Sequence, residues 1–538
     1  MRAKIFLQGL IAFLIVAFGQ PSFSVLLAPI AAAVGFALFW HAIRIYPFKR
    51  QRFWRATLWY GAVSIIQLSW MSAIEYQGIY ILLVWLGLSI GLGLQFGLLS
   101  ILIPYKRHLN FPCILAIASV WTLLEWSRYH FICGYSWNLC GIALSHVYAI
   151  QLGAVFGILG LTFWVMMVNL LGLRAFLRKG IVHYLIWGGA VCLPYLFGFC
   201  HISYHDAQIA KRTDLPKLSC ALVQTGLLPP EKTPIQGKIR AFINPYDQWK
   251  RILFFLKEEG KSHFDLIVLP EAVVPLSSGT AFYDRNKVET VFLEIFGSVP
   301  ASIFPEGDSD MVSNVFWSQS LSNIFSSEVV IGLDHVEPDG KSYNSAFHFK
   351  PFDSSASRYD KQVLMPLAEY LPFRFLAPLV KSYGIADFFT PGDGAKLFHG
   401  KVPMAVSICY EETFPHKIRE GRLLGAKLLV NVTNDGWYPY SRLPSQHFEH
   451  AKFRAVENGV ALVRACNTGV SAVVDSLGRT VGRLEECGGA TRIQTGVLST
   501  QITAYEYSTL FSLWGNGGIV CLSLLFLVIF AIFKKELD

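Results

Sequence analysis

Residues 265–271 read Asp265-Leu266-Ile267-Val268-Leu269-Pro270-Glu271, four consecutive apolar residues followed by a proline and a carboxylate. A continuous apolar run of this length is typical of a central strand that is buried on both faces of a sheet. We therefore expect a sheet covered on both sides, with Glu271 just past the carboxyl end of one strand. Similar short runs recur, and we predict strands at 218–224, 265–269, 328–333, 343–349, 402–408, 427–432, 460–465 and 470–475.

Polar turns and amphipathic segments separate these strands, and we expect helices at 244–259 and 446–458. Strands that alternate with helices are typical of an α/β domain with a layered core. The stretch 276–326 is long and weakly patterned, and such connections are commonly functional lids or disordered. The apolar segment Leu371–Leu379 either packs in the core or touches lipid. We expect both segments to shield a site from water.

Long apolar runs dominate the rest of the chain. Of the 538 residues, 53% are hydrophobic and only 15% are charged. A helix needs about 20 predominantly apolar residues to cross a bilayer. We therefore predict a membrane α-helical bundle of about eight spans. Its apolar runs lie at 5–18, 23–43, 56–74, 79–103, 111–127, 150–173, 183–200 and 511–533.

Positive charge is unevenly distributed between these runs. The formal net charge is +9, and residues 1–210 hold thirteen Lys and Arg against three acidic residues. Fourteen Lys and Arg lie at the termini and in alternate short connectors, whereas the other short connectors hold only Arg128. The positive-inside rule therefore places both termini in the cytoplasm and the segment from about 201 to 510 on the opposite face. This topology explains the basic charge better than binding to nucleic acid does.

The sequence divides into three regions on this basis. We predict seven transmembrane helices at 1–205, an extracytoplasmic catalytic domain at 206–508, and a last transmembrane helix with a cytoplasmic tail at 509–538. The ten cysteines include no CxxC pair, so no zinc or redox motif is indicated. His447 and His450 are three residues apart on a predicted helix, but no third ligand accompanies them. We expect no metal site and no cofactor.

Three strand ends carry residues suited to nucleophilic catalysis. Glu271, Lys361 and Cys409 each follow a predicted strand, and the carboxyl ends of strands in α/β sheets are where ligands gather. A thiol attacks only as a thiolate, so it requires a base and an electropositive setting. Glu271 can accept the proton. Lys361 can favour the thiolate and then stabilise an oxyanion together with the backbone N–H of Tyr410.

The motifs around these residues resemble those of the apolipoprotein N-acyltransferases of bacterial inner membranes, a branch of the nitrilase (carbon–nitrogen hydrolase) superfamily. The resemblance extends over essentially the whole chain. It is carried by Leu269-Pro270-Glu271, Tyr359-Asp360-Lys361, Ala368-Glu369-Tyr370-Leu371-Pro372-Phe373, Ile408-Cys409-Tyr410-Glu411, Asn434-Asp435-Gly436-Trp437, and the stretch from Gln446-His447 to Asn467-Thr468-Gly469.

The resemblance implies an αββα sandwich and a two-stage acyl transfer. Cys409 would take a fatty acyl chain from a membrane phospholipid and form a thioester. The α-amino group of a lipoprotein's N-terminal S-diacylglyceryl cysteine would then accept the chain. The catalytic domain would lie on the periplasmic face of the inner membrane. Glu369 would be a second carboxylate of the site, and Tyr410 and Glu411 would belong to the same pocket wall.

Several alternatives remain open from the sequence. Glu369 could simply pair with Lys361, and Tyr410 could contribute only its backbone amide. The same triad would also serve a membrane-anchored amidase or hydrolase, and a transporter or scaffold with a degenerate domain is a further alternative. Few charges lie within the spans, which argues against transport. Eight spans exceed what an anchor needs, which argues against a simple hydrolase.

Two features of the membrane-side sequence are also unresolved. Family members commonly carry a functional Trp soon after the strand that ends here at Gln224, yet no Trp follows until Trp249. Acyl-donor handling is therefore expected to differ. Glu125 and Arg128, near the outer end of the fifth span, could bind a phospholipid headgroup or simply pair with each other.

Overall fold

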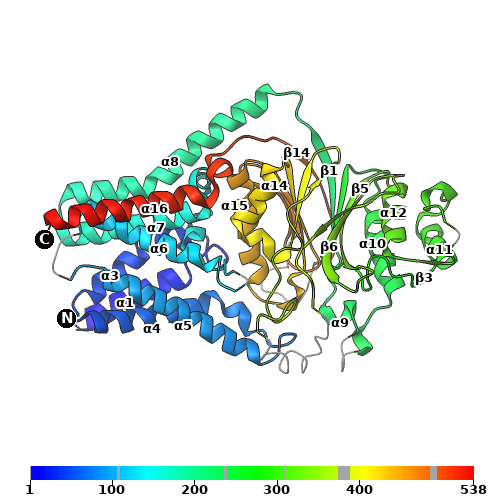
Figure 1. Cartoon of the computed structure of the whole chain (residues 1–538). Coiled ribbons are helices and arrows are strands. Elements are labelled where there is room, and N and C mark those ends of the chain that lie inside the picture. The colour runs from blue at the N-terminus through cyan, green and yellow to red at the C-terminus, as the bar shows by residue number, and fades with distance from the viewer. Residues whose placement is uncertain are drawn as a thin grey trace. The chain divides into compact units, whose positions relative to one another are not determined.

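The computed structural model describes residues 2–105, 109–132, 134–234, 239–307, 309–373, 388–484 and 494–537. The chain forms two compact units (Figure 1). One, here called the helical unit, comprises Met1–Arg212, Ser441–Gly459 and Ser508–Asp538. The other, the sandwich unit, comprises Thr213–Tyr440 and Val460–Tyr507.

Long apolar helices make up the helical unit. Four segments are long and apolar enough to span a membrane, namely Tyr80–Ile101, Ala149–Arg178, Ile181–Lys211 and Leu510–Ile532, and two shorter apolar helices cover Ala3–Ala17 and Leu27–Ile43. The helices are α1 (Arg2–Ala17), α2 (Leu27–Ile30), α3 (Phe36–Ile43), α4 (Lys49–Gln67), α5 (Tyr80–Ile101), α6 (Phe111–Arg128), α7 (Gly153–Arg178), α8 (Ile181–Lys211), α15 (Leu443–Asn458) and α16 (Leu510–Leu537).

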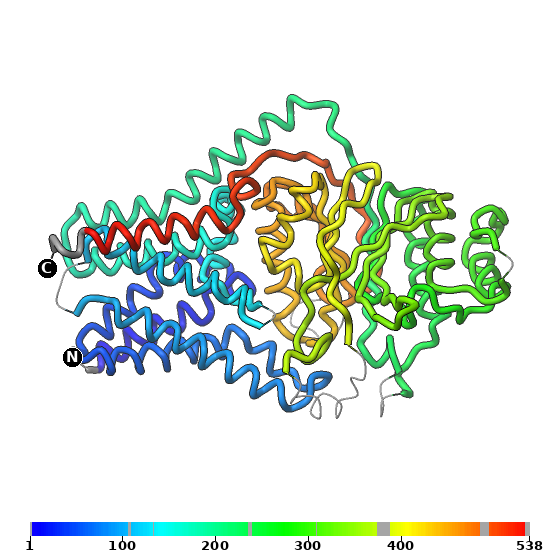
Figure 2. The backbone as a smooth tube through the Cα atoms, in the orientation of Figure 1, coloured from blue at the N-terminus to red at the C-terminus, as the bar shows by residue number. Residues whose placement is uncertain are grey.

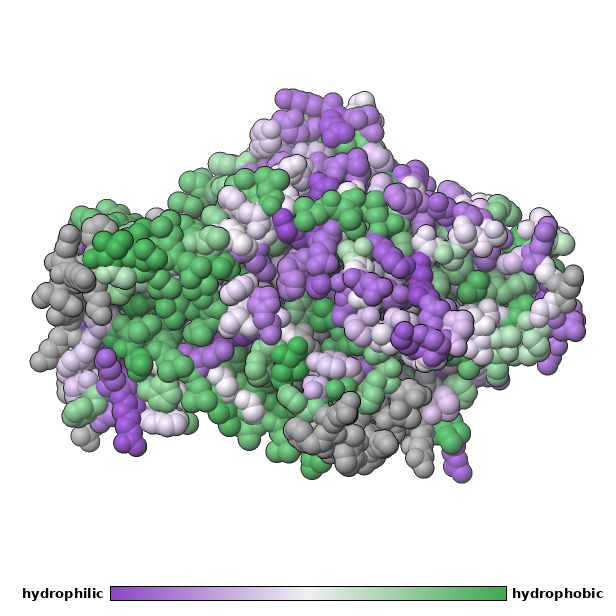
Figure 3. Space-filling model, viewed as in Figure 1, coloured by the Kyte–Doolittle hydropathy of each residue, from purple (hydrophilic) through white to green (hydrophobic). Residues whose placement is uncertain are grey.

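The surface of these helices is apolar (Figure 3). Leu185 and Leu196 on α8 and Leu513 and Val528 on α16 are each more than half exposed. Soluble proteins rarely expose large contiguous apolar patches, so these faces are suited to lipid. The chain is therefore a membrane protein with several candidate spanning helices.

Two six-stranded sheets form the sandwich unit. The first has the order β14-β1-β2-β5-β6-β7 and the second β13-β12-β11-β10-β9-β8. The first comprises β1 (Lys217–Gln224), β2 (Leu266–Leu269), β5 (Glu328–Val336), β6 (Ser342–Phe349), β7 (Ser357–Asp360) and β14 (Gly496–Thr503). The second comprises β8 (Leu397–Phe398), β9 (Met404–Ile408), β10 (Leu428–Thr433), β11 (Ala461–Cys466), β12 (Ser471–Val474) and β13 (Thr480–Leu484).

Alternating side chains of β2 explain the layers. Leu266 and Val268 lie in the apolar core between the two sheets. Ile267 and Leu269 lie in a second core that also contains residues of α10 (Pro245–Glu258), α11 (Arg285–Phe296) and α12 (Asn314–Ile324). On the other sheet, α14 (Pro415–Leu423) packs against β9. The order helix, sheet, sheet, helix is that of a nitrilase-like α/β sandwich, and the prediction of a strand buried on both faces is confirmed.

All eight predicted strands are present within two or three residues of their expected limits. The sequence did not predict β14, which pairs antiparallel with β1 from Lys217↔Thr503 to Gln224↔Gly496 (Figure 2). The helix predicted at 244–259 is confirmed as α10. The helix predicted at 446–458 is confirmed as α15, but it belongs to the helical unit.

The expectation of a lid or disordered loop at 276–326 is wrong for its described residues. This stretch contains α11 and α12, which pack in the core beside the first sheet. Val288, Val291 and Phe292 are buried on α11, at the three- and four-residue spacing of an amphipathic helix. The apolar faces of α11 and α12 therefore hold this segment against the first sheet. Of Leu371–Leu379, residues 374–379 lie outside the described residues.

Gly332 on β5 offers a test of how the sheet fixes Glu271. A Cβ at Gly332 would lie 2.5 Å from Glu271 Cα and 2.6 Å from Pro270 O, so the backbone would have to move. We expect Gly332→Ala to lower the free energy of unfolding by about 1–3 kcal/mol, the usual cost of overpacking. A Cβ at Gly394 would meet nothing within 4 Å, so Gly394→Ala is the control. Equal denaturation midpoints for the two variants would contradict this packing.

Candidate active site

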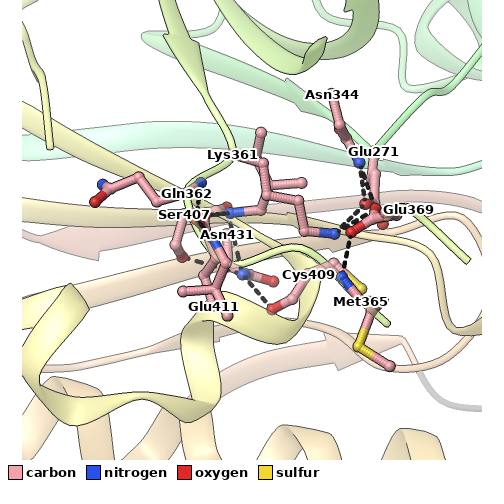
Figure 4. A network of polar contacts seen from close by, with 12 residues as sticks. Glu271, Asn344, Lys361, Gln362, Met365, Glu369, Ser407, Cys409, Glu411 and Asn431 are labelled. Carbon is pink, nitrogen blue, oxygen red and sulfur yellow. Dashed lines mark hydrogen bonds and ion pairs between the residues drawn. The ribbon is translucent and has the colours of Figure 1, made fainter. Parts of the chain in front are cut away.

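Three strand ends of the sandwich unit bring Glu271, Lys361 and Cys409 into one cluster (Figure 4). Lys361 Nζ lies 3.1 Å from Glu271 Oε1 and 2.7 Å from Glu369 Oε1. The Lys361 side chain is 1% exposed. Two carboxylates therefore share one buried ammonium. Their charges raise the pKa of Lys361 well above its usual value even though burial alone would lower it.

Asn344 on β6 fixes the relative positions of the two carboxylates. Its Nδ2 donates to Glu271 Oε1 at 2.8 Å and to Glu369 Oε1 at 3.0 Å. The backbone carbonyl oxygen of Asn344 accepts from Lys361 N at 2.9 Å. Glu369 Oε2 also accepts from Met365 N at 2.8 Å. Asn344 was missed from the sequence, where the only signal was an amide inside an apolar strand.

Cys409 begins the turn that follows β9. Its φ of +52° lies in the left-handed region, which is unusual for a residue with a side chain. Asn431 on β10 donates from Nδ2 to Cys409 O at 3.4 Å and to Ser407 Oγ at 3.1 Å, which supports this turn. Strained backbone of this kind occurs most often at functional sites.

The electrostatic setting of the thiol is mixed. Burial raises the pKa of Cys409, the charge of Glu271 raises it further, and the ammonium of Lys361 opposes both. The setting therefore disfavours the thiolate form of Cys409. Such a thiol needs a base at the moment of attack, and Glu271 is the carboxylate whose charge acts on it most strongly.

Glu411 connects the turn at Cys409 with the segment that follows Lys361. Its carboxylate accepts from the backbone N–H groups of Ile408 at 2.8 Å, Gln362 at 2.6 Å and Val363 at 3.1 Å. Tyr359 Oη also donates to it, at 2.9 Å. Burial raises the pKa of Glu411, while these backbone donors oppose the rise. These contacts brace the turn at Cys409 against the segment after Lys361, and the predicted place of Glu411 in the wall of the active-site pocket stays a prediction.

Tyr410 is buried, and its ring packs edge-on against Phe414 at a centroid distance of 4.9 Å. The role predicted for its backbone N–H, stabilising an oxyanion, stays a prediction.

A second lysine approaches Glu271 from the segment after β1. Lys232 is buried, and its Nζ donates to the carbonyl oxygen of Glu271 at 3.3 Å. Burial lowers the pKa of Lys232 to about 8, against the opposing charges of Glu271 and Asp334. No sequence motif marks Lys232. Trp249 on α10, the first Trp after Gln224, stacks on Trp317 of α12 with their ring centroids 5.3 Å apart.

Several other predicted residues serve the framework. Asn434 Oδ1 accepts from Gly436 N at 3.2 Å and from Asn467 Nδ2 at 3.1 Å, which is turn chemistry joined to a neighbouring strand end. Cys466 is buried and donates from Sγ to Val470 O at 3.1 Å. Cys487 lies outside the described residues.

On α15, the rings of His447 and His450 contact Trp137 at 5.5 and 5.6 Å. No group of three potential metal ligands is present among the described residues.

The chain is similar to known proteins over nearly its full length. A carbon-nitrogen hydrolase family model matches residues 235–505, and a model of the apolipoprotein N-acyltransferase N-terminal domain matches residues 12–171. The chain is 31% identical to an apolipoprotein N-acyltransferase of Chlamydia caviae, with 96% of each chain covered. It is 32% identical to one of Chlamydia pneumoniae, with 95% of this chain and 94% of the relative covered. A relative from Rickettsia prowazekii is 27% identical over 76% of this chain.

The charges around the thiol predict opposite effects of Glu271→Gln on two reactions of Cys409. Loss of the negative charge lowers the pKa of the thiol, so alkylation of Cys409 by iodoacetamide at a fixed pH should rise about three- to tenfold. Acyl transfer, which needs the base, should fall about 10²- to 10⁴-fold. Peptide mass spectrometry measures the alkylation as the modified fraction of the peptide that contains Cys409. A parallel fall in both reactions would contradict this assignment of charges.

Proposed function

The chain belongs to the apolipoprotein N-acyltransferase family of the carbon–nitrogen hydrolase superfamily, and on that basis we propose that Cys409, Glu271 and Lys361 carry out its acyl transfer. The observation that supports this most directly is the buried Lys361 ammonium, held between Glu271 and Glu369 beside the thiol. The acyl donor is a membrane phospholipid, and the acceptor is the amino group of a lipoprotein's S-diacylglyceryl cysteine.

The first stage forms a thioester. Glu271 accepts the proton of the thiol as Cys409 Sγ attacks the carbonyl carbon of a phospholipid ester. The resulting oxyanion is stabilised by the Lys361 ammonium and the backbone N–H of Tyr410. The ester C–O bond then breaks, and Glu271 returns the proton to the leaving oxygen. A lysophospholipid departs and the acyl chain remains on the sulfur.

The second stage consumes the thioester. The neutral α-amino group of the acceptor attacks the thioester carbonyl, and Glu271 accepts a proton from its nitrogen. The C–S bond breaks as the amide forms, and the proton passes to Cys409 Sγ, which restores the thiol. The same residues therefore serve both stages, with Glu271 alternating between base and acid.

Glu369 keeps Glu271 available as that base. Glu369 takes the shorter contact with Lys361 Nζ at 2.7 Å, whereas Glu271 lies at 3.1 Å. The cluster of two carboxylates and one ammonium thus has one negative charge in excess, which can accept a proton. Glu369 therefore assists catalysis through its ion pair with Lys361.

The membrane arrangement supports access to both substrates. We infer about eight spans, the four long apolar helices together with α1, the α2–α3 segment, α4 and α6. Fourteen basic residues on one side against one on the other favour cytoplasmic termini and a sandwich unit on the periplasmic face of the inner membrane. Lipoproteins and the phospholipids of the outer leaflet are both accessible at that face.

Transfer and hydrolysis are distinguished by the fate of the acyl chain. Purified enzyme given radiolabelled phospholipid and a diacylglyceryl-cysteine peptide should place the label on the peptide amine. Cys409→Ala should reduce this to background, while Cys466→Ala, which removes a buried structural thiol, should retain most activity. Release of the label mainly as free fatty acid, with the acceptor present, would favour a hydrolase instead.

Membrane vesicles extend the same assay to orientation. With acceptor peptide supplied only outside, right-side-out vesicles should acylate it and inverted vesicles should not. The reverse pattern would contradict the periplasmic assignment.

A further inference from the structure

The helical unit contains a buried guanidinium whose hydrogen bonds are incomplete. Arg128 is the last residue of α6 and is 4% exposed. Its Nε donates to Gln95 Oε1 on α5 at 2.9 Å. Its Nη1 and Nη2 have no hydrogen-bond partner among the residues that the structure describes. A buried charged group with unmade hydrogen bonds is strongly unfavourable unless a ligand or water completes them.

The neighbouring carboxylate does not complete them. Glu125 Oε1 lies 3.9 Å from Arg128 Nη1, beyond hydrogen-bonding distance. That oxygen already accepts from Trp121 Nε1 at 2.9 Å and from Cys140 N at 3.0 Å. The other oxygen accepts from Thr162 Oγ1 at 2.6 Å. Glu125 therefore holds α6, α7 and the segment at Cys140 together, and it gives Arg128 a charge partner but no hydrogen bond to the terminal nitrogens.

Other nearby charges are already matched. Arg454 and Glu457, both on α15, form a buried ion pair with Nε 2.9 Å from Oε2. Glu457 Oε1 also accepts from Ile158 N at 2.7 Å. The carboxylate of Glu457 is therefore engaged elsewhere in the helical unit.

We propose that Arg128 binds the phosphate of a phospholipid through Nη1 and Nη2. These two nitrogens form one edge of the planar guanidinium, and that edge matches two oxygens of a phosphate group. Gln95, which accepts the hydrogen bond from Nε, is only partly buried, and the guanidinium lies 5.0 Å from the centroid of the Trp121 ring.

The residues that follow Arg128 suit the acyl chains of the same ligand. Phe131 and Ile132 are 73% and 52% exposed. A ligand that joins an anionic phosphodiester to hydrocarbon would satisfy both the guanidinium edge and this apolar surface. The cost of burying Arg128 is then offset when lipid is bound.

This proposal rests on the proposed function, because it assumes that the acyl donor is a phospholipid. Lipid binding at Arg128 can nevertheless be measured without any reaction at Cys409. The test uses the full-length Cys409→Ala chain in a phosphate-free detergent, with native mass spectrometry to count bound dipalmitoylphosphatidylglycerol. Adding Arg128→Gln should weaken binding about ten- to a hundredfold, the loss that two charge-assisted hydrogen bonds carry. Adding Arg128→Lys, which keeps the charge but not the planar edge, should give an intermediate loss and covers the case in which the Gln variant fails to fold.

Three controls separate this site from general effects. Arg55→Gln removes an exposed cation of α4 that lies over the Tyr46 ring, and it should leave lipid binding unchanged. Dipalmitoylglycerol, which lacks the phosphate, should bind equally weakly with and without Arg128. With Cys409 restored, acylation by p-nitrophenyl palmitate should be unaffected by Arg128→Gln.

Unchanged phosphatidylglycerol binding in both Arg128 variants would overturn the proposal. Displacement of the lipid by millimolar inorganic phosphate would also overturn it, because the site would then be one for free phosphate. Loss of acylation by the headgroup-free ester in step with lipid binding would assign Arg128 a structural role. Absence of any thioester in the enzyme with Cys409 would instead count against the proposed function and leave the binding result intact.

Discussion

One buried ammonium between two carboxylates is the constraint on which this active site depends. Removing Lys361, Glu271 and Glu369 from water is costly, and only close, well-directed contacts offset that cost. The contacts of 3.1 and 2.7 Å from Lys361 Nζ provide them. Glu271 follows β2 and Lys361 follows β7 in the first sheet, while Cys409 follows β9 in the second. Glu271, Lys361 and Cys409 therefore come together only when the two sheets are packed face to face.

Neutral hydrogen bonds fix the geometry that the charges require. Asn344 orients Glu271 and Glu369 together, and Glu411 ties the turn at Cys409 to the segment after Lys361. Gly332 lets β5 approach the backbone of Glu271 more closely than any side chain would allow. A preorganised site of this kind needs little rearrangement as charge develops in the transition state. The framework residues therefore hold the reacting ones in position.

The sequence was most informative where short-range pattern and chemistry coincide. Apolar runs predicted the central strands, and the residues just past them predicted Glu271, Lys361 and Cys409 as partners. Asn344 and Lys232 could not be predicted, because neither lies just past a predicted strand or within a recognisable motif. The error at 276–326 had a different origin. The spacing of Val288, Val291 and Phe292 was readable as one face of a helix but was outweighed by the length of the connection.

The proposed reaction requires Cys409 to carry the acyl chain as a thioester. Incubating the purified enzyme with phospholipid, without acceptor, and then digesting it at mildly acidic pH preserves such a bond for peptide mass spectrometry. We expect a fatty acyl mass on the peptide that contains Cys409, and this mass should disappear on brief treatment with neutral hydroxylamine. An acyl mass on a different residue, or acyl transfer to acceptor by an enzyme in which Cys409 never becomes acylated, would contradict it.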